Sequence, residues 1–175
     1  ISLGLVGSEM CIRDSVYSTP WVAETGQTLR TIQDYDALAE RLRGVAGVTR
    51  AAPLIKGQAM ATHQGRNAGV QVFGIRSDDL RTLPRIAPSD KTAGDIARFD
   101  QGIAIGSGVA RELGVTVGDR IRLITPDGVK TAFGTSPRVN AYEVVYVFTA
   151  GRWDIDQTRV YMPLSLIHIS EPTRP

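Results

Sequence analysis

Hydrophobic and polar positions along this chain follow a helical period only briefly. Within residues 34–44, apolar side chains recur three and four positions apart, at Tyr35, Leu38 and Leu42. This spacing predicts a short amphipathic helix that begins after Asp34 and stops at Gly44, which we expect in the left-handed C′ conformation. The next apolar stretch, residues 48–55, predicts a strand.

Strand-like patterns dominate the next part of the chain. Residues 57–76 read as a hairpin, with a polar turn at 63–67 between two apolar segments. Residues 77–100 contain proline and glycine breaks and charges of both signs. They predict an irregular segment with at most one short helical turn.

The second half begins with a strand, a short helix and a glycine stop within residues 102–114, where Ser107 is expected to cap the helix. Apolar strands follow at 120–124, 144–148 and 159–162. Residues 125–140, rich in Pro, Gly, Ser and Thr, predict a long hairpin arm between the first two of these strands. Short helices and hairpin connections favour an α+β fold over a doubly wound sheet.

Composition narrows the class of protein. The chain has 175 residues, 42% of them hydrophobic, and a formal charge of +2. It can bury a core of its own, and one domain of about 150 residues is the default. The small charge and the absence of a basic run indicate no nucleic acid partner. The sequence contains no apolar run near the roughly 20 residues that cross a bilayer.

Both ends of the sequence resemble translated sequencing adapter. Residues 165–174 and residues 5–14 are encoded by the two complementary strands of one adapter-like DNA sequence. We therefore interpret residues 1–15 and 164–175 as artefact. That interpretation removes the single cysteine, Cys11, and leaves His63 as the one histidine. It excludes disulfides, thiolate catalysis and Cys/His zinc sites.

We find no catalytic or cofactor-binding constellation in the remaining residues. The sequence Gly106-Ser107-Gly108 follows a strand but lacks the last glycine of a dinucleotide fingerprint, and no nucleophile elbow surrounds Ser107. His63 lies in a polar turn. The carboxylates Asp78, Asp79, Asp90 and Asp95 match no metal-binding loop. Trp153 is either an interface aromatic or a half-buried loop anchor.

The hairpin arm is the candidate functional site. We single out six residues in its distal part for partner binding: Thr131, Phe133, Gly134, Thr135, Pro137 and Arg138. Open strand edges, an aromatic ring and a guanidinium are suited to edge pairing or insertion into a groove of a partner protein. From the residues alone, an ordinary variable loop is an equally good interpretation.

The order of several short motifs resembles a known family. They are Ala52-Pro53-Leu54, Gly74-Ile75, Leu113-Gly114-Val115-x-Val117-Gly118-Asp119 and Val160-Tyr161-Met162-Pro163-Leu164. Together they are similar to the periplasmic domain of lipoprotein-releasing ABC transporter permeases, the LolC/LolE group of the MacB-like periplasmic core domains. The resemblance covers nearly all of residues 30–163.

The resemblance implies a domain organisation. Residues 16–56 correspond to a first Porter-like βαβ unit, and residues 57–163 to a strand-rich Sabre-like part. The arm at residues 125–140 corresponds to a Hook hairpin, to which the six candidate residues then belong. A second Porter unit and the membrane helices of the family have no counterpart in this sequence.

It also implies a function. The chain is expected to be a non-catalytic periplasmic segment of an inner-membrane permease, with no cofactor and no metal. Its expected partners are a LolA-like periplasmic carrier, a second permease subunit, a separate ATPase subunit and the lipoprotein substrate. Three alternatives stay open: a MacB-like efflux permease, an FtsX-like signalling permease and, from another class, a small soluble β-barrel enzyme domain.

Overall fold

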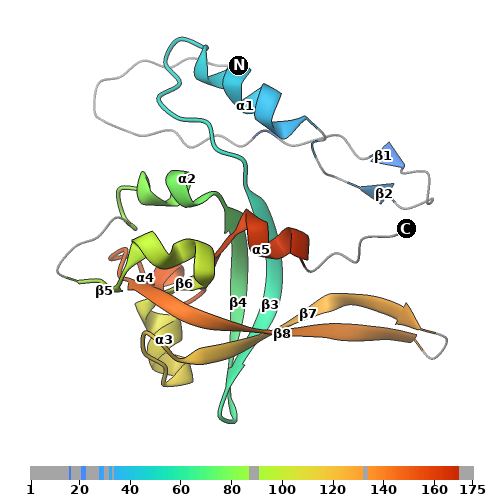
Figure 1. Ribbon diagram of the computed structural model, residues 1–175, viewed down its shortest axis with the longest axis vertical. Coiled ribbons are helices and arrows are strands. Elements are labelled where there is room, and N and C mark those ends of the chain that lie inside the picture. Colours follow the sequence, from blue (N-terminus) through green and yellow to red (C-terminus); the bar gives the residue numbers. More distant parts are fainter. Residues whose placement is uncertain are drawn as a thin grey trace. The chain divides into compact units, whose positions relative to one another are not determined.

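The computed structural model describes residues 16, 21–22, 28–29, 32, 34–86, 91–131 and 134–169. The chain divides into two compact units, residues 1–48 and 49–175 (Figure 1). Mixed helix and strand content confirms the α+β prediction. No helix among the described residues has both the length and the apolar character needed to cross a bilayer.

The first unit contains one helix and a two-stranded ladder. Strands β1 (Trp21–Val22) and β2 (Thr28–Leu29) pair antiparallel, and helix α1 spans Tyr35–Arg43, which confirms the predicted helix. Its predicted stop at Gly44 is confirmed, since Gly44 is the C-cap residue, but the predicted left-handed conformation is wrong: Gly44 has φ −75°, and the left-handed glycine is Gly47, with φ +88°. The chain continues in hydrogen-bonded turns after α1, so the reversal comes three residues later.

The second unit holds the remaining elements. These are β3 (Ile55–His63), β4 (Arg66–Ile75), α2 (Ser77–Arg81), β5 (Ala93–Gly94), the 3₁₀ helix η1 (Ile96–Gln101), β6 (Ile103–Gly106), α3 (Ser107–Leu113), β7 (Arg120–Thr131), β8 (Gly134–Phe148), α4 (Trp153–Asp156), β9 (Arg159–Pro163) and α5 (Leu164–Ile169).

Six of these strands close into a ring. The sheet order is β5-β8-β6-β9-β4-β3-β7, and β7 also pairs with β8. Closure is possible because β8 is 15 residues long: its residues 144–148 pair with β6, and its earlier residues pair with β7. Strand β5 stands outside the ring, beside β8.

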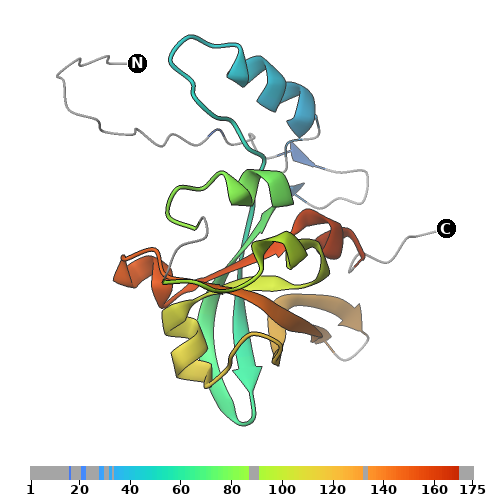
Figure 2. The ribbon, with the colours of Figure 1, turned by 60° about the vertical axis from the view of Figure 1, so that its left-hand side comes forward.

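Two apolar clusters stabilise this unit. The first fills the ring: all six strands and α3 contribute to it, and Ile103, Ile121 and Val160 in it are fully buried. The second lies against the other face of β4, β9, β6 and β8, under α2, η1 and α4 (Figures 1 and 2). The central strand β6 is therefore buried along its whole length.

The hairpin predicted at residues 57–76 is confirmed as β3 and β4. Its turn is tighter than expected, with only Gln64 and Gly65 between the strands and φ values of +45° and +85°. Positive φ at both positions is the signature of a type I′ turn. The predicted strand at 48–55 is wrong: the ladder begins at the pair Ile55↔Gly74, and β4 ends one residue later, so the residues before Ile55 have no strand to pair with.

Two further local predictions are wrong. Residues 77–101 contain α2, β5 and η1, because widely spaced apolar residues such as Leu80 and Phe99 are completely buried in the second cluster. Ser107 does not cap α3: Gly106 is the N-cap residue, and Ser107 is the first residue of the helix. The glycine stop is confirmed, since Gly114 adopts φ +67°.

Candidate functional site

The structure forms an antiparallel hairpin from β7 and β8 over the predicted arm. The ladder runs without interruption from Arg120↔Glu143 to Thr125↔Arg138 and resumes from Val129↔Ser136 to Thr131↔Gly134. In Figure 1 these strands cross β3 and β4 and extend to the right, away from α3 and α4. The distal part of the hairpin thus projects from the ring.

Four of the six predicted site residues have a place in this ladder. Thr131 pairs with Gly134 at its distal end, Thr135 pairs with Lys130, and Arg138 pairs with Thr125. Pro137 lies within β8 and is exposed, whereas Arg138 is partly buried. Phe133 lies outside the described residues. The register therefore places the other five along the two strands of the arm.

The ladder is irregular between its two parts. Residues 126–128 of β7 face the single residue Pro137 of β8, because the register shifts between Thr125 and Val129. A bulge of this kind bends a hairpin and increases its local twist. It divides the arm into a root, 120–125 with 138–143, and a distal hairpin, 129–131 with 134–136.

An apolar row crosses the root of the arm, and sequence reasoning missed it. Met60 of β3 pairs with Ile124 of β7, which pairs in turn with Val139 of β8. Directly paired residues point to the same face of a sheet. Met60 is 50% exposed and Val139 52% exposed, so this row faces solvent. Its neighbour on β7, Arg122, is exposed on the same face.

This row has no signal in the sequence alone. Met60 and Val139 are almost 80 positions apart, and each is an isolated apolar residue in a strand. Only the register of three strands shows that they are adjacent. Single exposed apolar residues are common, but an aligned row beside a projecting hairpin indicates a contact surface.

The turn that leads into β7 is fixed by a carboxylate. Asp119 accepts hydrogen bonds from the backbone N–H of Thr116 at 2.7 Å and from its hydroxyl at 3.1 Å. These bonds lower the pKa of Asp119 from its usual value near 3.8. The hydrogen bond of His63 Nδ1 with the carbonyl oxygen of Arg120, at 2.9 Å, ties the β3–β4 turn to the first residue of β7. The root of the arm is thus anchored to the ring by polar contacts as well.

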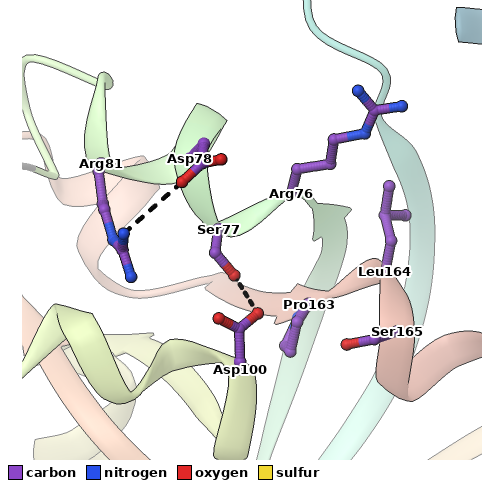
Figure 3. A pocket seen from close by; sticks show the side chains of 8 residues that line it. All are labelled: Arg76, Ser77, Asp78, Arg81, Asp100, Pro163, Leu164 and Ser165. Atoms are coloured by element: carbon purple, nitrogen blue, oxygen red, sulfur yellow. Dashed lines mark hydrogen bonds and ion pairs between the residues drawn. The ribbon is translucent and has the colours of Figure 1, made fainter.

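A polar pocket of about 290 Å³ lies elsewhere on the second unit (Figure 3). Its lining residues are Arg76, Ser77, Asp78, Arg81, Asp100, Pro163, Leu164 and Ser165. The polar groups inside it bind one another: the Ser77 hydroxyl donates to Asp100, and Arg81 lies 3.6 Å from Asp78. This arrangement contains neither a histidine nor a thiol that could act on a substrate.

The structure also bears on the other candidates from the sequence, Trp153 and the carboxylates. Trp153 is 77% exposed at the start of α4, so the half-buried interpretation is wrong and the interface interpretation stays open. In the part of the chain that the structure describes, no His, Cys, Asp or Glu residues gather into a metal-binding group. Asp90, one of the four carboxylates considered, lies outside that part.

Comparisons with known proteins agree with this architecture. The model of the MacB-like periplasmic core domain matches residues 8–174. The lipoprotein-releasing system transmembrane protein LolC of Neisseria meningitidis serogroup B is 29% identical over 168 residues, which cover 94% of this chain and 39% of that protein.

A solved structure shows a similar fold. It is the extracellular domain of the noncanonic ABC-type transporter YknZ from Gram-positive bacteria. The TM-score is 0.50 at 19% identity, over 78% of this chain and 65% of that one. The chain thus spans less than two thirds of each relative. Because the family model matches almost the whole sequence, the chain belongs to the MacB-like periplasmic core domain family, as its motifs predicted.

Proposed function

We propose that this chain is a periplasmic segment of an inner-membrane ABC transporter permease that releases lipoproteins and passes them to a soluble periplasmic carrier. The observation that carries the proposal is the hairpin arm that projects from the closed ring, in a chain similar to LolC over 94% of its length. The segment itself performs no catalysis in this proposal. A separate ATPase subunit supplies the energy, and a second permease subunit completes the transporter.

The arm supplies the contact with a LolA-like carrier. Its distal hairpin has open strand edges, and its bulge carries the exposed Pro137. Its root carries the apolar row Met60, Ile124 and Val139 on one face and Arg138 on the other, because successive residues of a strand alternate between faces. Aromatic and arginine side chains dominate the binding energy of many protein interfaces. We therefore assign the carrier contact to the six arm residues, with Phe133 and Arg138 as the strongest contributors.

The test is a titration of the chain with a purified LolA-type carrier. We expect the double variant Phe133→Ala, Arg138→Glu to bind the carrier at least about tenfold more weakly, because loss of a central aromatic or arginine often costs more than about 2 kcal/mol. We expect the same variant to keep the thermal unfolding midpoint of the parent, since Arg138 lies on the arm and is not among the residues of the two apolar clusters.

A matched control carries the same charge reversal on the body of the unit. Arg111→Glu reverses an exposed charge on α3 and leaves Trp153, whose interface interpretation stays open, unchanged. This control binds the carrier like the parent. Equal affinities for parent, arm variant and control contradict the assignment of the arm. A parent with no affinity for the carrier contradicts the lipoprotein-handling role itself.

The domain boundaries and the origin of the two ends form a second part of the proposal. We assign residues 16–56 to a Porter-like unit, 57–163 to a Sabre-like part, and residues 1–15 and 164–175 to adapter. Reading the gene outward from primers within residues 30–160 tests this. Natural codons that continue smoothly through residues 5–14 and 165–174 in the source DNA overturn the adapter origin.

A further inference from the structure

The two strands of the arm both lose their hydrogen-bonding pattern at the same point. At the bulge, Pro126 of β7 and Pro137 of β8 occur within the same irregular stretch, between the pairs Thr125↔Arg138 and Val129↔Ser136. Proline has no amide hydrogen and donates nothing to a ladder. Neither residue can therefore tie the root of the arm to its distal hairpin by a backbone N–H.

The additional residues of β7 in the bulge increase the conformational freedom of the backbone there. Asp127 and Gly128 complete the three residues of β7 that face Pro137. Glycine is the residue with the fewest backbone restrictions. A short ladder follows, with the three pairs 129↔136, 130↔135 and 131↔134. An isolated two-stranded hairpin of this size is only marginally stable in water. Among the described strands, none pairs with this ladder along its outer edges.

The root is held in a different way. Its strands continue into the ring, where Ile121, Leu123 and Val144 are buried in the first cluster. Asp119 and His63 fix the start of β7 through their hydrogen bonds. The arm therefore consists of a root that is part of the ring and a distal ladder joined to it through the bulge.

We infer that the proline-flanked bulge at residues 126–128 and 137 is a hinge, about which the distal hairpin changes its direction relative to the ring. Hinges are short stretches that absorb backbone dihedral changes while the segments on either side move as units. The inference deepens the proposed function. The hinge itself does not depend on that function, but one further step rests on it: when the carrier binds, it selects one orientation of the distal hairpin.

Distances between paired spin labels test the hinge without any carrier. All variants carry Cys11→Ser. A distal pair of labels is placed at Lys130→Cys and Arg111→Cys, and a root pair at Arg122→Cys and Arg111→Cys. We expect the distal pair to give a distance distribution at least about twice as wide as the root pair, because only the distal pair spans the hinge.

A variant without the bulge gives the matched comparison. It lacks Asp127 and Gly128 and carries Pro126→Thr and Pro137→Thr, so that β7 and β8 can pair one to one. In this variant we expect the distance distribution of the distal pair to narrow to the width of that of the root pair. The distance distribution of the root pair stays unchanged. If the distance distributions of the distal and root pairs are equally wide in the parent, the hinge is overturned. It is also overturned if removing the bulge leaves the width of the distal distribution unchanged.

A milder variant protects the test against misfolding. Pro137→Thr alone restores one donor and leaves the bulge in place, and we expect it to narrow the distal distribution in part. If the excised variant does not fold and Pro137→Thr leaves the distal width unchanged, the inference is rejected. We expect addition of a LolA-type carrier to narrow the distance distribution of the distal pair in the parent. If the parent shows the hinge but binds no carrier, the proposed function is contradicted and the hinge is not.

Discussion

Strands β7 and β8 each lie partly in the ring and partly outside it, and the two parts differ in what stabilises them. Inside the ring, Ile121 and Val144 are completely buried and Leu123 is 3% exposed. On the outer face of the root Val139 is 52% exposed, and Pro137, in the bulge beyond the root, is exposed as well. Apolar burial thus stabilises the part of these strands inside the ring, whereas backbone pairing is what the structure describes for the distal hairpin.

This difference separates structural from functional residues. Side chains in the ring contribute to the free energy of unfolding, because they are removed from water. The described side chains on the outer face of the arm gain little by folding and are available to a partner. Substitutions in the two halves are therefore expected to affect different measurements, stability in the ring and binding in the arm.

The largest expected effect on stability is the loss of an aromatic side chain from the second apolar cluster. Phe148→Ala removes a fully buried aromatic side chain whose centroid lies 5.5 Å from that of Tyr161. We expect it to lower the free energy of unfolding by about 3–5 kcal/mol in urea titrations. Val139→Ala, in the same strand but exposed, changes it by less than about 0.5 kcal/mol. Similar losses for both variants would erase the distinction between ring and arm.

A smaller effect is expected where the backbone of the ring is closely packed. A Cβ atom at Gly106 would lie 2.3 Å from the carbonyl oxygen of Asp156, too close for any rearrangement of side chains to relieve. Gly106→Ala is therefore expected to destabilise the chain by about 1–3 kcal/mol.

The control for this prediction is a glycine in the β3–β4 hairpin. A Cβ atom at Gly69 meets no atom within 4 Å. Gly69→Ala is expected to leave the thermal midpoint within about 1 °C of the parent, which corresponds to only a few tenths of a kcal/mol for a chain of this length. A drop as large as that of Gly106→Ala would show that neither glycine reports on close packing.

The smallest effect concerns the turn at the root of the arm and depends on pH. The pKa of Asp119 is lowered in the folded chain, so its carboxylate stabilises the fold above the pKa of the unfolded chain. That contribution is lost as the pH falls through the lower, folded-state pKa. Asp119→Asn is therefore less stable than the parent at neutral pH, and the difference disappears in acid.

The measurement is the unfolding midpoint of both chains from pH 7 down into the acid range. Glu112→Gln, an exposed charge change on α3, serves as the control and is expected to follow the parent at every pH. A constant offset between Asp119→Asn and the parent across this range contradicts the role of the ionised carboxylate.

Much of the local structure could be predicted from the sequence, because it depends on nearby residues. The helix at 35–43, the β3–β4 hairpin and the strand, helix and glycine stop at 103–114 follow from periodicity and turn residues within about ten positions. The motifs that order these elements were also sufficient to predict the family.

The predictions that were wrong concern residues whose structure depends on partners distant in sequence. The apolar positions of residues 48–54 predict a strand, but none of the described strands pairs with these residues, because β4 ends at Ile75. Leu80 and Phe99 look like isolated apolar residues in a polar segment, and only the second cluster explains their burial. In both cases pairing or packing outweighs local preference.

The sequence by itself determined the helix at 35–43, the β3–β4 hairpin, the strand and helix at 103–113, the family and the location of the arm between two apolar strands. Only the tertiary structure decided that the six strands close into a ring, that Met60, Ile124 and Val139 form one row, and that the register of the arm shifts at residues 126–128. The physical reason is that strand register joins residues far apart in the chain. A pattern along the chain shows which positions favour a strand, but not which strand each will meet.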